Sequence, residues 1–177
     1  HGAFGSKDRY GPLVEHWARR GYVVIQANHA DSTALTGGRP DPSTLRLWAE
    51  RPKDVKLILD SVPTLARRLT GFVGTLDADR IGVGGHSFGA HTAQLMGGAR
   101  TATGPGAKHV DHADPRVRAV IVLSGQGRGE ALDEDSWKTL AVPDLVMTGT
   151  RDDSGRTGKP YTWRTEPYAY APPGDKT

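Results

Sequence analysis

The chain has 177 residues, of which 23 are Lys or Arg and 20 are Asp or Glu, so its formal net charge is +3. This length is enough for one domain with a core and short for two ordinary domains. The basic residues are dispersed, unlike the clustered stripe of a nucleic-acid-binding protein, and no apolar run approaches the roughly 20 residues of a membrane span. Without cysteine, the chain has no disulfide, thiolate metal site or cysteine nucleophile. We expect no nucleic-acid partner and no membrane span, and leave the compartment and oligomeric state open.

The first part of the chain predicts two helices with a strand between them. Residues 10–20 have the apolar spacing of an amphipathic helix, and residues 22–27 are apolar and β-branched, as in a buried strand. The polar stretch over 30–42 is rich in Gly and Pro and predicts a loop. A second helix is expected from about Pro52, with a kink or interruption at Pro63.

The rest of the chain continues the alternation. Strands are predicted over 80–84, 117–123 and 143–148, and helical segments over 87–96 and 133–140. Residues 101–115 are predicted as a polar loop, and the tail over 154–177 has four prolines and little periodicity. This order predicts a single α/β domain over residues 1–177, with a mainly parallel sheet and helices on both faces. In such sheets, functional sites form outside the carboxyl ends of the strands.

Residues 85–89 read Gly-His-Ser-Phe-Gly, the pattern of a nucleophile elbow. An apolar strand precedes it and a helical segment follows Ser87, which is the strand–turn–helix context that the elbow requires. The glycines let the backbone turn sharply, and the serine then lies at a helix N-terminus, where developing negative charge is favoured. The alternative interpretation is an ordinary glycine-rich turn with Ser87 as a helix cap.

A serine nucleophile needs backbone donors for the oxyanion. The N–H of the residue after the nucleophile, here Phe88, is one candidate. The second donor comes from an earlier loop before a helix, and His1-Gly2-Ala3 has that place in the chain. We expect the N–H of Ala3 to be this donor.

The third member of a catalytic triad should be a carboxylate after a later strand. Asp152 and Asp153 follow the strand predicted over 143–148, and a buried Asp there would orient an imidazole and stabilise the imidazolium. Asp152 is preferred and Asp153 is the alternative. Two solvated loop carboxylates are the competing interpretation.

Together these motifs resemble the α/β-hydrolase superfamily, in the group of dienelactone-hydrolase-like esterases and platelet-activating-factor acetylhydrolases. The segments that carry the resemblance are 1–5, 21–24 leading to 28–29, 79–90 and 148–153. The resemblance implies the α/β-hydrolase fold and a serine carboxylic-ester hydrolase that acts through an acyl-enzyme on a small or lipid-like ester, without a cofactor. Bacterial polyester hydrolases are similar in the same region, and a non-catalytic binding protein with this fold is the alternative from another class.

The sequence departs from the family in its histidines. The family order is Ser, Asp, His, yet all seven histidines precede the acid: positions 1, 16, 29, 86, 91, 109 and 112. We therefore expect a domain truncated at both ends, with a strand missing before His1 and the catalytic histidine beyond Thr177. The tail is expected to lead into a last strand, and the fragment as given is expected to be inactive.

One further cluster resembles a metal site. His109, Asp111, His112 and Asp114 are close in sequence, but they lie in a polar segment without a helix to fix the spacing of ligands. We expect neither a metal nor a cofactor.

Overall fold

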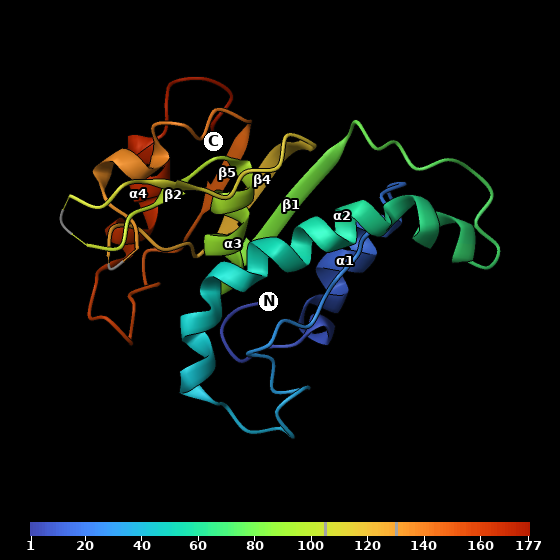
Figure 1. Cartoon of the computed structure of the whole chain (residues 1–177), viewed down its shortest axis with the longest axis horizontal. Helices are drawn as coiled ribbons and strands as arrows, with labels where there is room; N and C mark the ends of the chain where they lie inside the picture. Colours follow the sequence, from blue (N-terminus) through green and yellow to red (C-terminus); the bar gives the residue numbers. More distant parts are fainter. Residues whose placement is uncertain (105, 130) are drawn as a thin grey trace. The chain divides into compact units, whose positions relative to one another are not determined.

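The computed structural model describes residues 1–104, 106–129 and 131–177, which form two compact units, His1–Ala78 and Asp79–Thr177 (Figure 1). The second unit contains a parallel sheet with helices, so the chain has an α/β fold, as predicted. Helices on both faces and a single domain over the whole chain stay predictions.

Three strands in the order β1-β4-β5 form the sheet of the second unit: β1 (Ile81–His86), β4 (Val117–Leu123) and β5 (Asp144–Met147). Both pairings are parallel, with His86 opposite Leu123 and Leu123 opposite Met147. This register brings the carboxyl ends of all three strands to one edge. All three predicted strands of this unit are confirmed, and the residues that follow them lie at the edge where α/β proteins place their sites.

Helix α3 (Phe88–Gly97) packs against β1 and β4 in the second unit (Figure 1). Every residue from Gly89 to Gly97 is buried, including the polar residues His91 and Gln94. The small residues allow a close approach: a Cβ added to Gly97 would lie 2.6 Å from Val120 Cγ1. The predicted helix over 87–96 is thereby confirmed.

A buried aromatic residue connects α3 to a short 3-10 helix, η3 (Glu134–Trp137). The side chain of Trp137 is fully buried, and its Nε1 donates a hydrogen bond of 2.6 Å to Oε1 of the buried Gln94. An indole N–H that leaves water needs such a partner. The helix predicted over 133–140 is shorter in the structure than expected. It nevertheless supplies the largest side chain of the core.

Two regions for which the sequence predicts no helix contain regular structure. The short strands β2 (Arg100–Thr101) and β3 (Val110–Asp111) pair antiparallel, and the tail forms the helices η4 (Tyr161–Thr165) and α4 (Glu166–Tyr170). Strands and helices this short leave almost no periodicity in the sequence, so the pattern could not reveal them.

The end of the tail also pairs with β5. The N–H of Asp144 donates to the carbonyl of Asp175 at 3.0 Å, and the N–H of Val146 donates to the carbonyl of Thr177 at 2.7 Å. The bridge between Asp144 and Lys176 is parallel. The last residues of the tail therefore run parallel to β5, at the edge of the sheet that this strand forms.

The first unit contains η1 (Lys7–Tyr10), α1 (Gly11–Ala18), η2 (Pro42–Ala49) and α2 (Glu50–Arg68). Both predicted helices are present. Of the two alternatives expected at Pro63, an interruption is wrong, since α2 continues through it for five residues, and a kink stays a prediction. Proline removes one backbone hydrogen bond from a helix interior, and here the helix tolerates that loss. None of the described helices combines the length and apolar character needed to cross a membrane.

The strand predicted over 22–27 is absent from the structure. This segment has no regular secondary structure and no ladder partner among the described residues, and Tyr22, Val23 and Ile25 are 65%, 44% and 42% exposed. Strand propensity describes how a side chain fits a pleated, half-buried surface. Without a neighbouring strand, β-branched residues alone do not make a sheet.

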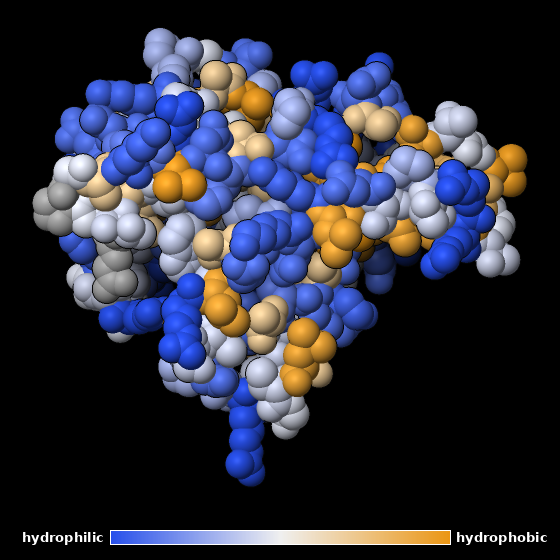
Figure 2. Space-filling view, in the orientation of Figure 1, coloured by the Kyte–Doolittle hydropathy of each residue, from blue (hydrophilic) through white to orange (hydrophobic). Residues whose placement is uncertain are grey.

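Apolar side chains also reach the surface after α2. Leu69 and Val73 are 45% and 98% exposed, and Figure 2 shows apolar patches over the segment that follows this helix. The first unit therefore buries little apolar area. Its interior contains a buried ion pair instead, in which the Arg51 guanidinium contacts both carboxylate oxygens of Asp31 at 2.7 Å.

Candidate active site

The turn between β1 and α3 holds Ser87 in an unusual backbone conformation. Its φ of 52° and ψ of −117° are strained for a residue with a side chain. Two hydrogen bonds fix the residue: its N–H donates to the carbonyl of Leu123 at 2.8 Å, and its carbonyl accepts from the N–H of His91 at 3.1 Å. The serine thus lies directly between the end of a strand and the start of a helix, as the sequence pattern predicts.

Glycine at position 85 is a steric requirement of this turn. A Cβ added to Gly85 would overlap the carbonyl group of Gly89 and would lie 2.7 Å from the nitrogen of Ala90. The obstructing atoms are backbone, so a side chain at this position could not be accommodated by a change of rotamer. The glycine lets the strand end and the helix start touch.

The Ser87 hydroxyl makes no hydrogen bond within the part of the chain that the structure describes. The histidines nearest in sequence have other surroundings. His91 is buried in α3 and stacks on Phe88, with 6.1 Å between ring centroids. His86 ends β1 and is influenced electrostatically by Asp152. No histidine of the described residues therefore acts as a hydrogen-bonded base for this serine.

Each of the three strands is followed directly by a hydroxyl residue: Ser87 after β1, Ser124 after β4 and Thr148 after β5. Because the strands are in register, these residues share the carboxyl edge of the sheet. Ser124 is also held at a positive φ of 52°, and its N–H donates to the carbonyl of Met147 at 2.8 Å.

Asp152 lies at this edge and accepts hydrogen bonds from the other two hydroxyls. Its Oδ2 accepts from Ser124 Oγ at 2.5 Å and from Thr148 Oγ1 at 2.9 Å, while its Oδ1 lies 3.2 Å from Arg164 Nε. Burial raises the pKa of the Asp152 carboxyl. The two hydrogen bonds and the charges of Arg164 and His86 lower it by more, so the pKa lies below its ordinary value.

Asp153 has different surroundings. It is exposed, and its Oδ1 accepts a hydrogen bond of 2.8 Å from the N–H of Tyr161. This is the arrangement of a carboxylate that stabilises a loop. The structure therefore brings Asp152, and not Asp153, together with groups at the edge where Ser87 lies.

Ala3 belongs to the first unit and lies in a turn closed by a hydrogen bond of 3.0 Å from Gly5 N–H to the Gly2 carbonyl. The next residue, Phe4, has a φ of 61°, and its N–H donates to Asp31 at 3.0 Å. The N–H of Ala3 itself has no acceptor among the described residues. Its role as an oxyanion donor, like that of Phe88 at the start of α3, stays a prediction.

The residues of the suspected metal cluster have separate partners. His109 bonds to Asp133, Asp111 to Arg100, His112 to Thr101 and Asp114 to Arg116. The described residues contain no group of three or more side chains placed to ligate a metal.

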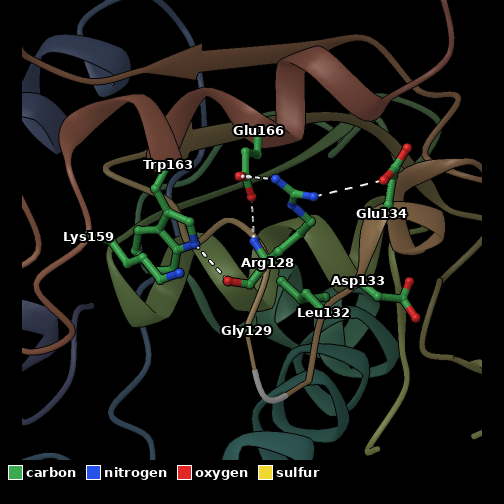
Figure 3. A pocket seen from close by; sticks show the side chains of 8 residues that line it. All are labelled: Arg128, Gly129, Leu132, Asp133, Glu134, Lys159, Trp163 and Glu166. Carbon is green, nitrogen blue, oxygen red and sulfur yellow. Dashed lines mark hydrogen bonds and ion pairs between the residues drawn. The ribbon is translucent and has the colours of Figure 1, made fainter. Parts of the chain in front are cut away.

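A cavity of about 460 Å³ opens in the second unit (Figure 3). It is lined by Arg128, Gly129, Leu132, Asp133, Glu134, Lys159, Trp163 and Glu166. The indole Nε1 of Trp163 donates to the carbonyl of Arg128 at 2.8 Å, and the Arg128 guanidinium pairs with Glu166 at 3.0 Å. Neither Ser87 nor Asp152 lines this cavity, so we do not include it in the candidate site.

The sequence did not point to Ser124, Thr148 or Arg164. The positions of Ser124 and Thr148 could have been noticed in the sequence, because each lies at the carboxyl end of a predicted strand of a parallel sheet. Arg164 had no such signal, since it lies in the tail, twelve residues after the carboxylate that it contacts.

Comparison with known proteins yields no match to a protein-family model, a curated protein or a solved structure.

The Gly85 contact predicts a position-specific loss of stability. Gly85→Ala forces the backbone of the turn to shift, and we expect it to lower the free energy of unfolding by about 1–3 kcal/mol. The control is Gly82→Ala in the same strand, where the new Cβ would lie 3.8 Å from the nearest atom and the change should stay within about 0.5 kcal/mol. Urea unfolding of both variants measures this, and equal losses would contradict the steric argument.

The electrostatic link between Asp152 and His86 predicts a shift in titration. Partial desolvation holds the pKa of His86 below its ordinary value, while the Asp152 carboxylate opposes that effect. Asp152→Asn removes the negative charge that favours the imidazolium, so the pKa of His86 should fall further. NMR titration of the His86 ring protons measures the change. Asp153→Asn is the control, and a larger fall in that variant would show that the wrong carboxylate has been placed near His86.

Proposed function

We propose that the chain is a serine carboxylic-ester hydrolase of the α/β-hydrolase type, with Ser87 as nucleophile and Asp152 as the acid of its triad. The observation that carries this proposal is the strained conformation of Ser87 in a turn that only glycine at position 85 allows. Strain of this kind persists where the surrounding structure fixes it, and it is concentrated at functional sites.

The distribution of strain supports the same proposal. The described residues include three non-glycine residues with positive φ: Phe4, Ser87 and Ser124. Two of them lie in the second unit at the candidate site: Ser87 is the proposed nucleophile, and Ser124 bonds to the proposed acid. An ordinary helix cap at Ser87 would not explain the strain at Ser124.

The proposed reaction is acyl transfer through the serine oxygen. Ser87 Oγ attacks the carbonyl carbon of the ester as its proton passes to an imidazole base, and the carbonyl electrons move to the oxygen. We propose that the N–H of Phe88 stabilises this oxyanion, and one such donor contributes about 10²–10³ in rate. The intermediate collapses with loss of the alcohol, which takes the proton from the imidazolium, and water then hydrolyses the acyl-enzyme.

Asp152 has the properties of the carboxylate that orients such an imidazole. Its lowered pKa keeps it ionised at neutral pH, so it can accept the Nδ1–H of the ring and stabilise the imidazolium. A carboxylate offers about four acceptor positions. Ser124 and Thr148 take two of them, both on Oδ2, and Arg164 forms an ion pair with Oδ1.

The alternative function is a binding protein with the same fold. The observation that favours it is the Ser87 hydroxyl, which has no hydrogen-bond partner among the described residues. An unactivated serine is a weak nucleophile at neutral pH. We therefore expect residues 1–177 alone to turn over esters very slowly, and the decisive experiment supplies the base from solution.

The first prediction of this proposal concerns labelling of Ser87. A fluorophosphonate probe should label Ser87 slowly, and imidazole added at neutral pH should accelerate the labelling because it supplies the missing base. Ser87→Ala should abolish the labelling, while Ser61→Ala, which removes an exposed serine of α2, should leave it unchanged. Mass spectrometry locates the modified residue.

Labelling that imidazole does not accelerate, or that occurs at Ser124 instead, would favour the binding protein or another nucleophile. Where labelling succeeds, p-nitrophenyl esters of increasing chain length and a polyester film, each assayed with imidazole, distinguish a small or lipid-like ester from a polymer.

The second prediction separates the two aspartates. The orienting carboxylate of a complete triad is worth about 10⁴ in turnover, and imidazole that diffuses freely should recover only part of this, so Asp152→Asn should slow imidazole-assisted labelling by at least about tenfold. Asp153→Asn should change the rate by less than about twofold, because Asp153 is exposed and bonds only to a loop amide. A larger loss of labelling rate in Asp153→Asn would show that Asp153, and not Asp152, is the acid of the triad.

A further inference from the structure

We propose that Arg164 is a positioning residue for Asp152: it joins the loops that follow β4 and β5 and thereby fixes where the carboxylate points. This inference rests on the proposed function, since it gives Asp152 the role of the triad acid. It adds a residue that no motif of the sequence indicates.

Arg164 contacts both loops at once. It lies in η4 with only 9% of the residue exposed. Its Nη1 donates to the carbonyl of Ser124 at 2.6 Å and to that of Gly125 at 3.3 Å. Its Nε donates to the backbone carbonyl of Asp152 at 2.7 Å. One planar group therefore ties the backbone after β4 to the backbone after β5.

The same guanidinium also faces the carboxylate. Nε of Arg164 lies 3.2 Å from Oδ1 of Asp152, while Ser124 Oγ and Thr148 Oγ1 bond to Oδ2. The carboxylate is thus held at both oxygens. Among the described residues Oδ1 accepts no hydrogen bond, so it is open to an imidazole N–H.

Arg164 further secures Ser124, whose positive φ is strained. The Ser124 hydroxyl bonds to Asp152, so the direction of this bond depends on the backbone that Arg164 holds through the Ser124 carbonyl. The guanidinium stacks on the indole of the neighbouring Trp163, with 5.7 Å from Cζ to the ring centroid. Lysine could not reproduce this arrangement, because it lacks a planar fork of donors.

The charged groups that act on Asp152 are Arg164 from η4 and His86 from β1. Loss of Arg164 removes one positive charge and loosens the Ser124 hydroxyl, and both changes favour the protonated carboxyl. A residue that only stabilised the fold would not alter the titration of one particular carboxylate.

The experiment compares Arg164→Gln and Arg164→Lys with a matched control, Arg116→Gln. Arg116 also forms a two-bond pair with a carboxylate of the second unit, Asp114, at 2.8 and 2.7 Å, but Asp114 precedes β4 and lies away from the carboxyl edge. Two readouts are taken from the whole chain: the pKa of Asp152 from the NMR titration of its side-chain carboxyl carbon, and the rate of imidazole-assisted labelling of Ser87 by a fluorophosphonate.

We expect Arg164→Gln to raise the pKa of Asp152 and to slow labelling by about tenfold or more, since a misplacement of about 1 Å can cost 10²-fold in rate. Arg164→Lys should recover part of the pKa, because it keeps the charge, without recovering the rate. Arg116→Gln should change neither. If the buried Arg164 cannot be replaced without unfolding, Ser124→Ala tests the same link with a smaller change, and we expect shifts in the same directions.

Two results would overturn the inference while leaving the nucleophile in place: an unchanged pKa of Asp152 in Arg164→Gln or Ser124→Ala, or a raised pKa with an unchanged rate of labelling. Absence of Ser87-dependent labelling in the unmodified chain would instead overturn the proposed function, and the positioning role with it. The two failures are distinguishable because the unmodified chain is assayed in parallel.

Discussion

The contact between the end of β1 and the start of α3 is the constraint on which the candidate site depends. The absence of a Cβ at Gly85 lets the backbone of Gly89 approach, and this closeness forces the intervening residue Ser87 into a positive φ. The helix then begins immediately after the serine, and all of its residues from Gly89 to Gly97 are buried. A single missing side chain thus bears on both the packing of α3 and the backbone conformation of Ser87.

The parallel register extends this constraint to the other strands. His86, Leu123 and Met147 are aligned across the sheet, so the residue after each strand reaches the same edge. Ser87 and Ser124 each continue the ladder by one hydrogen bond of 2.8 Å to the neighbouring strand. Hydroxyl groups presented by three aligned strand ends can act on one another's surroundings, although they come from distant parts of the sequence.

The parts of this site that could be predicted are those encoded locally. The elbow needs only five consecutive residues between a strand and a helix, and the sequence shows all of them. The contacts that hold Asp152 also need Arg164, which comes from a short helix whose position depends on the tertiary fold. The strand predicted over 22–27 is absent because tertiary context also decides that segment. Its local propensity is that of a strand, but the described residues offer it no partner strand.

The neighbouring carboxylates Asp152 and Asp153 have different surroundings, and this difference bears on which of them belongs to a functional site. Asp153 makes one bond to a backbone amide and stays exposed, which any solvated turn provides. Asp152 is partly withdrawn from water, a change that by itself favours its neutral form. Two hydroxyls and a guanidinium oppose that effect and leave the group below its ordinary pKa. An anion that is both partly desolvated and kept ionised, with an acceptor position left over, suits a carboxylate that must stabilise a positive charge beside it. The surroundings of Asp152 therefore support its proposed role by an argument that is separate from the motif around Ser87.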